Sequence, residues 1–129
     1  MKIQSKTKSK FDFSLWKELC HKRAEERDKY RKRVLLEVDA ALDALGKRYL
    51  WDEIYIFGSL IKEGKFSSKS DVDLAINGLD EFKHFAFVGD ISALLNREVD
   101  VIRLEDCHFR KTIVTGGMKW SSKRNSPSS

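Results

Sequence analysis

The sequence predicts a mixed α/β domain in which helices flank a small sheet. Three observations support this prediction. A long helical pattern without glycine or proline opens the chain, short β-branched and aromatic runs follow it, and helical segments separate and follow the later runs. The expected order is therefore helix, strand, loop, strand, helix, strand, helix, which is typical of a mixed α/β domain with a small sheet.

The first expected element is a helix over residues 12–45, where no helix-breaking residue interrupts the chain. Gly46 follows it and is suited to cap its C-terminus. Residues 21–33 offer little to a core, so either one long helix projects into water there or two helices meet. A projecting helix with an apolar tip would suit a partner or a second copy of the chain. The later part carries one apolar stripe at helical spacing, formed by Val34, Val38, Ala41, Leu42 and Leu45.

Three short segments have the composition of strands. They are EIYIF at residues 53–57, DVDLAI at residues 71–76 and REVDVIRL at residues 97–104. Each contains β-branched residues, and EIYIF also contains aromatic residues. We expect all three to lie in the same sheet.

Two further helices are expected between and after these strands. The first covers residues 80–95, and the second covers residues 105–114 and is stopped by Gly116 and Gly117. The candidate core positions of the first helix are Phe82, Phe85, Ala86, Ile91 and Leu94.

The chain has the length of a single domain. It contains 129 residues, of which 41% are hydrophobic and 35% are charged. We expect one domain over residues 12–120, with a helical region at 12–46. Residues 1–11 and 121–129 are polar and rich in lysine or serine, so we expect them to be disordered tails, the first of them basic.

Composition excludes several classes of protein. No apolar run approaches the roughly 20 residues that span a bilayer, and no apolar segment follows the basic N-terminus. Cys20 and Cys107 form neither a disulfide framework nor a zinc-binding spacing. We therefore expect a cytoplasmic protein without a membrane or zinc.

The formal net charge of +5 raises the question of a nucleic-acid partner. Much of the excess lies in the first ten residues and in residues 21–33. The latter segment mixes both signs at helical spacing, which is typical of a solvated helix face. A basic nucleic-acid-binding protein therefore stays the third and weakest hypothesis.

Two aspartates stand one residue apart at the head of the second strand. Because strand side chains alternate between faces, Asp71 and Asp73 point one way while Val72 and Leu74 point into the core. Two strand residues span roughly 6.6 Å, so the carboxylates can lean toward one point. Like charges at that separation repel each other and raise each other's pKa. A divalent cation relieves this conflict, and hard oxygen ligands suit Mg²⁺.

A third acid fits the same face. Asp100 lies between Val99 and Val101, so it points away from a buried pair. If its strand is the neighbour of the aspartate-bearing strand, three acids share one face and can hold two metal ions. That arrangement supports in-line phosphoryl or nucleotidyl transfer, with Asp100 placed to lower the pKa of the acceptor hydroxyl or to take its proton.

A Gly-Ser pair after the first strand supplies the complementary half of such a site. Gly58 allows a sharp turn and a close approach of phosphate. The N–H groups that follow it and the hydroxyl of Ser59 can donate to phosphate oxygens. Lys62 and Lys65 add positive charge to the same loop.

The combination of strand, GS, loop, SDVDL, helix and VDVI resembles the nucleotidyltransferases of the DNA polymerase β superfamily, and most of all its small, single-domain minimal nucleotidyltransferases. The resemblance covers about residues 54–120. It implies a catalytic core at 53–120, a phosphate-contacting pair at Gly58 and Ser59, and a nucleotide donor, ATP. It also implies that Asp71, Asp73 and Asp100 bind Mg²⁺. Lys62 and Ser70 of the same loop complete the candidate nucleotide-binding set.

The family resemblance also implies a partner. Minimal nucleotidyltransferases commonly pair with a helical HEPN protein as antitoxin and toxin, and some transfer AMP to a tyrosine of that partner. This chain has little room for an acceptor domain, so we expect the hydroxyl to arrive on another macromolecule, in a homo- or hetero-oligomer. The alternative is a module of the same fold that neutralises its partner by contact alone.

Overall fold

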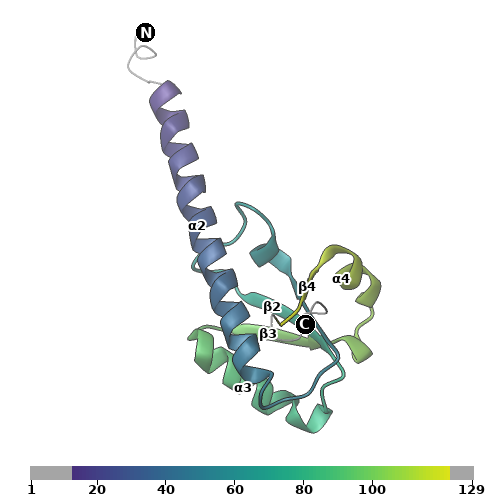
Figure 1. Ribbon diagram of the computed structural model, residues 1–129. Helices are drawn as coiled ribbons and strands as arrows, with labels where there is room; N and C mark the ends of the chain where they lie inside the picture. The colour runs from purple at the N-terminus through teal and green to yellow at the C-terminus, as the bar shows by residue number, and fades with distance from the viewer. Residues whose placement is uncertain (1–12, 123–129) are drawn as a thin grey trace.

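The computed structural model describes residues 13–122. The expected tails lie outside these residues, apart from Ser121 and Ser122. A long helix leads into a four-stranded sheet with shorter helices around it, so the mixed α/β class is confirmed (Figure 1). The elements are α2 (Phe13–Leu45), β1 (Glu53–Phe57), η1 (Gly58–Ile61), β2 (Val72–Asn77), η2 (Glu81–Lys83), α3 (His84–Leu95), β3 (Val99–Arg103), η3 (Leu104–Asp106), α4 (Arg110–Gly116) and β4 (Met118–Trp120).

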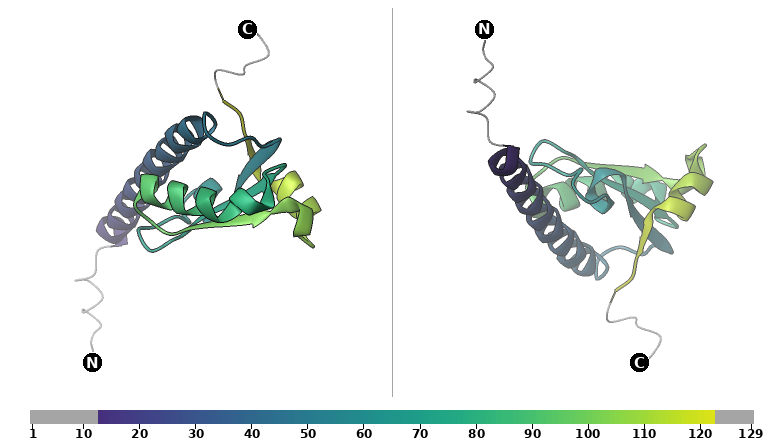
Figure 2. Two further views of the ribbon diagram at one scale, coloured as in Figure 1. Left: turned by 90° about the horizontal axis from the view of Figure 1, so that it is seen from below. Right: turned by 90° about the horizontal axis from the view of Figure 1, so that it is seen from above.

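The sheet has the strand order β3-β2-β1-β4. β1 pairs antiparallel with both β2 and β4, whereas β2 and β3 run parallel and are joined by the crossover through α3. α2 and α3 pack on one face of the sheet, and α4 packs on the other (Figure 2). The strands expected at residues 53–57, 71–76 and 97–104 are all present, with the third shortened to Val99–Arg103.

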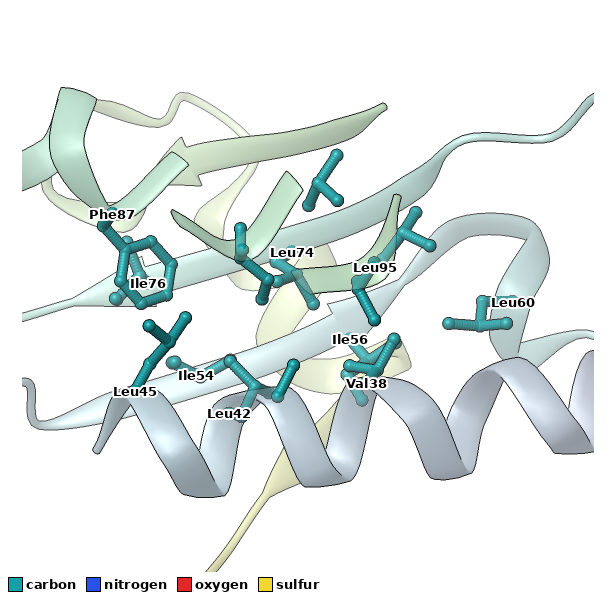
Figure 3. Packing of buried hydrophobic residues seen from close by; sticks show 14 of the residues in the cluster. Val38, Leu42, Leu45, Ile54, Ile56, Leu60, Leu74, Ile76, Phe87 and Leu95 are labelled. Carbon is teal, nitrogen blue, oxygen red and sulfur yellow. The ribbon is translucent and has the colours of Figure 1, made fainter. Parts of the chain in front are cut away.

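α2 is one continuous helix, which answers the question left open for residues 21–33. Its second half lies on the sheet with Val38 and Leu42 fully buried, while its first half extends beyond the sheet (Figures 1 and 3). Gly46 closes the last turn by donating its N–H to the Leu42 carbonyl at 2.9 Å. It does so without the positive φ that a glycine cap often adopts.

The core face of α3 differs from the one predicted. Phe87, Ile91 and Leu95 are buried, at positions i, i+4 and i+8. Of the five predicted core positions only Ile91 is correct, because the others, Phe82, Phe85, Ala86 and Leu94, are exposed. The physical reason is the helical period. Phe85 and Leu94 lie off the stripe of buried residues at i, i+4 and i+8. Phe82 precedes the helix, in a 3-10 turn where its N–H donates to the side chain of Asp80.

The last helix also starts later than predicted. Residues 105–114 were expected to be helical, but η3 covers Leu104–Asp106 and α4 begins only at Arg110. α4 ends at Gly116, as the glycine pair predicted, and β4 follows as the edge strand. In the described part of the chain, no helix has the length and apolar character needed to cross a bilayer.

Candidate active site

Two of the three predicted acids are direct neighbours across the parallel strands. Asp73 and Asp100 are register partners, as are Val72 and Val99 one position earlier. Val72 and Val99 belong to the core beneath α2 and α3. By alternation along each strand, Asp73 and Asp100 therefore share the opposite face of the sheet.

The third acid, Asp71, lies immediately before β2 and is exposed. Its negative charge nevertheless acts on Asp73. Partial burial of Asp73 raises the pKa of its carboxyl above the ordinary value, and the charges of Asp100 and then Asp71 raise it further. All three acids thus contribute to one region of negative potential, centred on Asp73.

This negative potential has no neutralising partner in the part of the chain that the structure describes. Within residues 13–122, no ion pair or side-chain hydrogen bond involves Asp71, Asp73 or Asp100. Across the same residues, no three histidine, cysteine, aspartate or glutamate side chains lie close enough together to hold a metal ion. The donor chemistry fits Mg²⁺, since all three groups are hard, uncompensated carboxylate oxygens. A shared ion would require the exposed side chains of Asp71 and Asp100 to rotate toward Asp73.

The Gly-Ser turn lies directly against these acids. Phe57, the last residue of β1, is the register partner of Asp73, and Gly58 follows it with φ of +78°. A Cβ placed on Gly58 would lie 2.4 Å from Oδ2 of Asp73. The position therefore requires glycine for two independent reasons, its left-handed backbone and the carboxylate beside it.

The other residues predicted to contact the nucleotide differ in their exposure and in their hydrogen bonds. Ser59 is half-buried in η1 beside Gly58, and its carbonyl accepts the N–H of Lys62 at 3.1 Å. Lys62 is exposed and has no ion-pair partner in the described chain. The hydroxyl of Ser70 accepts the N–H of Ser67 at 3.0 Å, so it shapes the loop instead of standing open toward a ligand.

Several residues that hold this loop were not anticipated. Arg31 and Tyr30 of α2, together with Arg97 before β3, contact loop residues 58–70 directly. Residues 21–33 were interpreted as a solvated helix face, which concealed these contacts. A signal was present in Phe66, the one large aromatic residue in a stretch rich in serine and lysine, and this side chain is fully buried.

Comparison with known families identifies the class of domain. Residues 47–124, more than half of the chain, match the family described as Polymerase beta, Nucleotidyltransferase. The chain therefore belongs to this nucleotidyltransferase family, which confirms the family resemblance seen in the sequence. No significant match was found among curated protein sequences.

Two solved structures share the fold. A chain from a crystal structure of a toxin-antitoxin with AMP-PNP is 22% identical, with a TM-score of 0.55, and the match covers 67% of this chain and 76% of that one. A chain from the toxin-antitoxin MntA-HepT is 20% identical, with a TM-score of 0.51, and the match covers 70% of this chain and 75% of that one. At these identities the likeness establishes the fold.

Proposed function

We propose that this chain is a Mg²⁺-dependent nucleotidyltransferase that transfers AMP from ATP to a hydroxyl group of a partner protein, as the antitoxin of a HEPN-type toxin. The observation that carries the proposal is the in-register pair Asp73 and Asp100, next to the turn at Gly58 and Ser59. Family membership supports nucleotidyl transfer. The two structural neighbours, both toxin-antitoxin proteins and one with AMP-PNP, support the nucleotide and the kind of partner.

The reaction assigns a task to each side of the site. The acceptor oxygen attacks the α-phosphorus of ATP, a new P–O bond forms, and the bond to the bridging oxygen of the β-phosphate breaks, so that pyrophosphate leaves with the bonding electrons. Gly58 lets the backbone approach the phosphates closely, and the hydroxyl of Ser59 donates to a phosphate oxygen. Lys62 adds a mobile positive charge at the edge of the loop.

The acids provide the opposite half of the site. When bound by Asp71, Asp73 and Asp100, Mg²⁺ would supply Lewis-acid stabilisation of the phosphate charge. Asp100 is exposed on the side of the strand pair that the acceptor can reach, so it accepts the proton of the attacking hydroxyl. Asp73 is the more buried of the pair and serves as the fixed ligand, next to the backbone of Gly58.

We place the acceptor on another protein because residues 13–122 form no second lobe that could enclose a small molecule. Beyond the sheet and its helices, the described chain offers only the projecting half of α2 (Figure 1). Leu19 on that half is 48% exposed, which leaves apolar surface available for a partner helix. A helical toxin that docks there carries its own hydroxyl toward the acids.

The test is label transfer from α-³²P-ATP in a purified complex of this chain with a HEPN-type helical protein. We expect Mg²⁺-dependent labelling of the partner, lost in Asp71→Asn and Asp73→Asn. Glu37→Gln is the matched control, because Glu37 is exposed on the half of α2 that lies on the sheet, carries the same charge and lies outside the site. A complex that shows no labelling, while both aspartate variants still neutralise the toxin, would establish neutralisation by contact alone.

A further inference from the structure

The loop between β1 and β2, residues 58–70, is fastened to α2 near its beginning. Nη1 of Arg31 donates to the Leu60 carbonyl at 3.0 Å, and Leu60 belongs to the same 3-10 turn as Gly58 and Ser59. The side chain of Arg31 is only 12% exposed, although it lies on a helix rich in charged residues. This arginine is therefore packed between α2 and the turn.

The charge of Arg31 is already paired within α2. Its Nε donates to Oδ1 of Asp28 at 2.9 Å. That hydrogen bond is the main cause that holds the pKa of Asp28 below its ordinary value, with Lys32 contributing less. Because the guanidinium is neutralised and oriented by Asp28, its contact with the Leu60 carbonyl places the turn, whereas a free positive charge would be available to bind phosphate.

A second attachment fixes the far end of the same loop. Phe66 is fully buried, and its ring stacks on that of Tyr30 with 5.8 Å between centroids. The guanidinium of Arg97 lies 5.0 Å from the centroid of Phe66. It donates to the hydroxyl of Tyr30 and, at 3.4 Å, to the carbonyl of Ser70. The loop is thus attached near both of its ends, and α2 contributes a residue to each attachment.

We propose that Arg31 is a positioning residue that holds the Gly58–Ser59 turn against Asp73 and thereby sets the affinity for the nucleotide. The proposal rests on the proposed function, because it assigns the turn to phosphate binding. Arg31 touches neither the phosphates nor the acids and acts through the backbone of Leu60. Its removal loosens the turn while leaving the carboxylates that carry out the chemistry in place.

Three variants test this assignment. Arg31→Met removes the hydrogen bonds and keeps much of the apolar stem, and Arg31→Lys keeps the charge without the planar fork. Lys47→Met removes a positive charge from the exposed turn after α2, away from the projecting half of the helix. For transfer from ATP in the complex, we expect Arg31→Met to raise KM about tenfold, in line with the loss of a charge-assisted hydrogen bond. We expect kcat to change by less than about threefold. Arg31→Lys should recover part of the loss, and Lys47→Met should match the unmodified protein.

Hydrogen exchange of the backbone amides gives an independent measurement that does not depend on transfer. We expect Arg31→Met to speed exchange within residues 58–64 and to leave exchange in β2 and β3 unchanged.

If the unmodified complex transfers nucleotide and Arg31→Met alters neither KM nor loop exchange, the positioning role is wrong and the proposed function stands. If the unmodified complex does not transfer, the proposed function fails, and the exchange result still decides whether Arg31 holds the turn. Equal loss of kcat and affinity with faster exchange throughout the domain would reduce Arg31 to a general contributor to stability and overturn the assignment.

Discussion

Asp73 occupies the space into which a side chain at position 58 would project, since a Cβ on Gly58 would lie 2.4 Å from its Oδ2 atom. The contact joins the two halves of the candidate site, the turn after β1 and the acid of β2. Gly58 also has a left-handed φ of +78°. Any larger residue at this position must displace either the turn or the carboxylate.

Substitution of Gly58 by alanine should damage the site as well as the fold. The positive φ costs about 1 kcal/mol for a residue with a Cβ, and the clash with Asp73 adds to that cost. We expect Gly58→Ala to abolish detectable label transfer and to lower the free energy of unfolding, measured by urea denaturation. Gly64→Ala is the matched control, because Gly64 has φ of +76° in the same loop but no atom within 4 Å of its would-be Cβ. Equal effects of the two substitutions on transfer would contradict the role of the Asp73 contact.

Removal of the charge of Asp73 should stabilise the metal-free protein. Because its pKa is raised in the folded state, ionisation of Asp73 costs more there than in the unfolded chain. This cost is present above the folded pKa and disappears as the pH falls toward the ordinary value of 3.8. We expect Asp73→Asn to raise the Tm by roughly 2–4 °C at pH 7, with a smaller gain at lower pH, measured by differential scanning calorimetry in EDTA. A lower Tm at pH 7 would count against the repulsion among the acids.

Asp100 should matter more for turnover than for nucleotide binding. The proposed function assigns the acceptor proton to Asp100, the exposed member of the pair, and general-base groups contribute about 10²–10⁴-fold to rates. We expect Asp100→Asn to lower kcat by about that factor and to change the Kd for Mg²⁺-ATP by much less, measured by titration calorimetry. Equal loss of kcat and affinity would show instead that Asp100 serves mainly as a ligand.

The two neighbouring phenylalanines of α3 should differ sharply in their effect on stability. Phe87 is fully buried, whereas Phe85 is 91% exposed. We expect Phe87→Ala to cost about 3–5 kcal/mol of unfolding free energy. Phe85→Ala should stay within about 0.5 kcal/mol, measured by the same urea titration. A large loss for Phe85→Ala would show that this side chain is covered in solution.

The elements with a single clear periodicity were predictable from the sequence. β1 begins and ends at the predicted residues, and the apolar stripe of α2 is buried as its spacing indicated. The face of α3 was not predictable by the same method. Its segment carries apolar residues on several faces, so periodicity alone cannot select Phe87 over Phe85. The choice depends on the sheet that the helix packs against.

The shared face of the acids could be predicted from the alternation of side chains along a strand. The contacts that hold the neighbouring loop could not be predicted in this way. Alternation along a strand placed Asp73 and Asp100 away from their buried neighbours, which agrees with the register of β2 and β3. The contacts of Arg31 and Arg97 with the loop join residues far apart in the sequence. Nothing in the local pattern distinguishes these arginines from the other basic residues near them. Only the tertiary arrangement reveals what they hold.

The unbroken axis of α2 has a thermodynamic consequence. The projecting half of α2 and Arg31, which contacts the Gly58–Ser59 turn, belong to one continuous helix. If a toxin binds the projecting half of α2 and shifts the helix, toxin binding changes the affinity of this chain for ATP. Linkage then requires that ATP alter the affinity for the toxin by the same factor. In that case the cellular ATP concentration would set the affinity between this chain and the toxin, and α2 would couple the two binding sites in both directions.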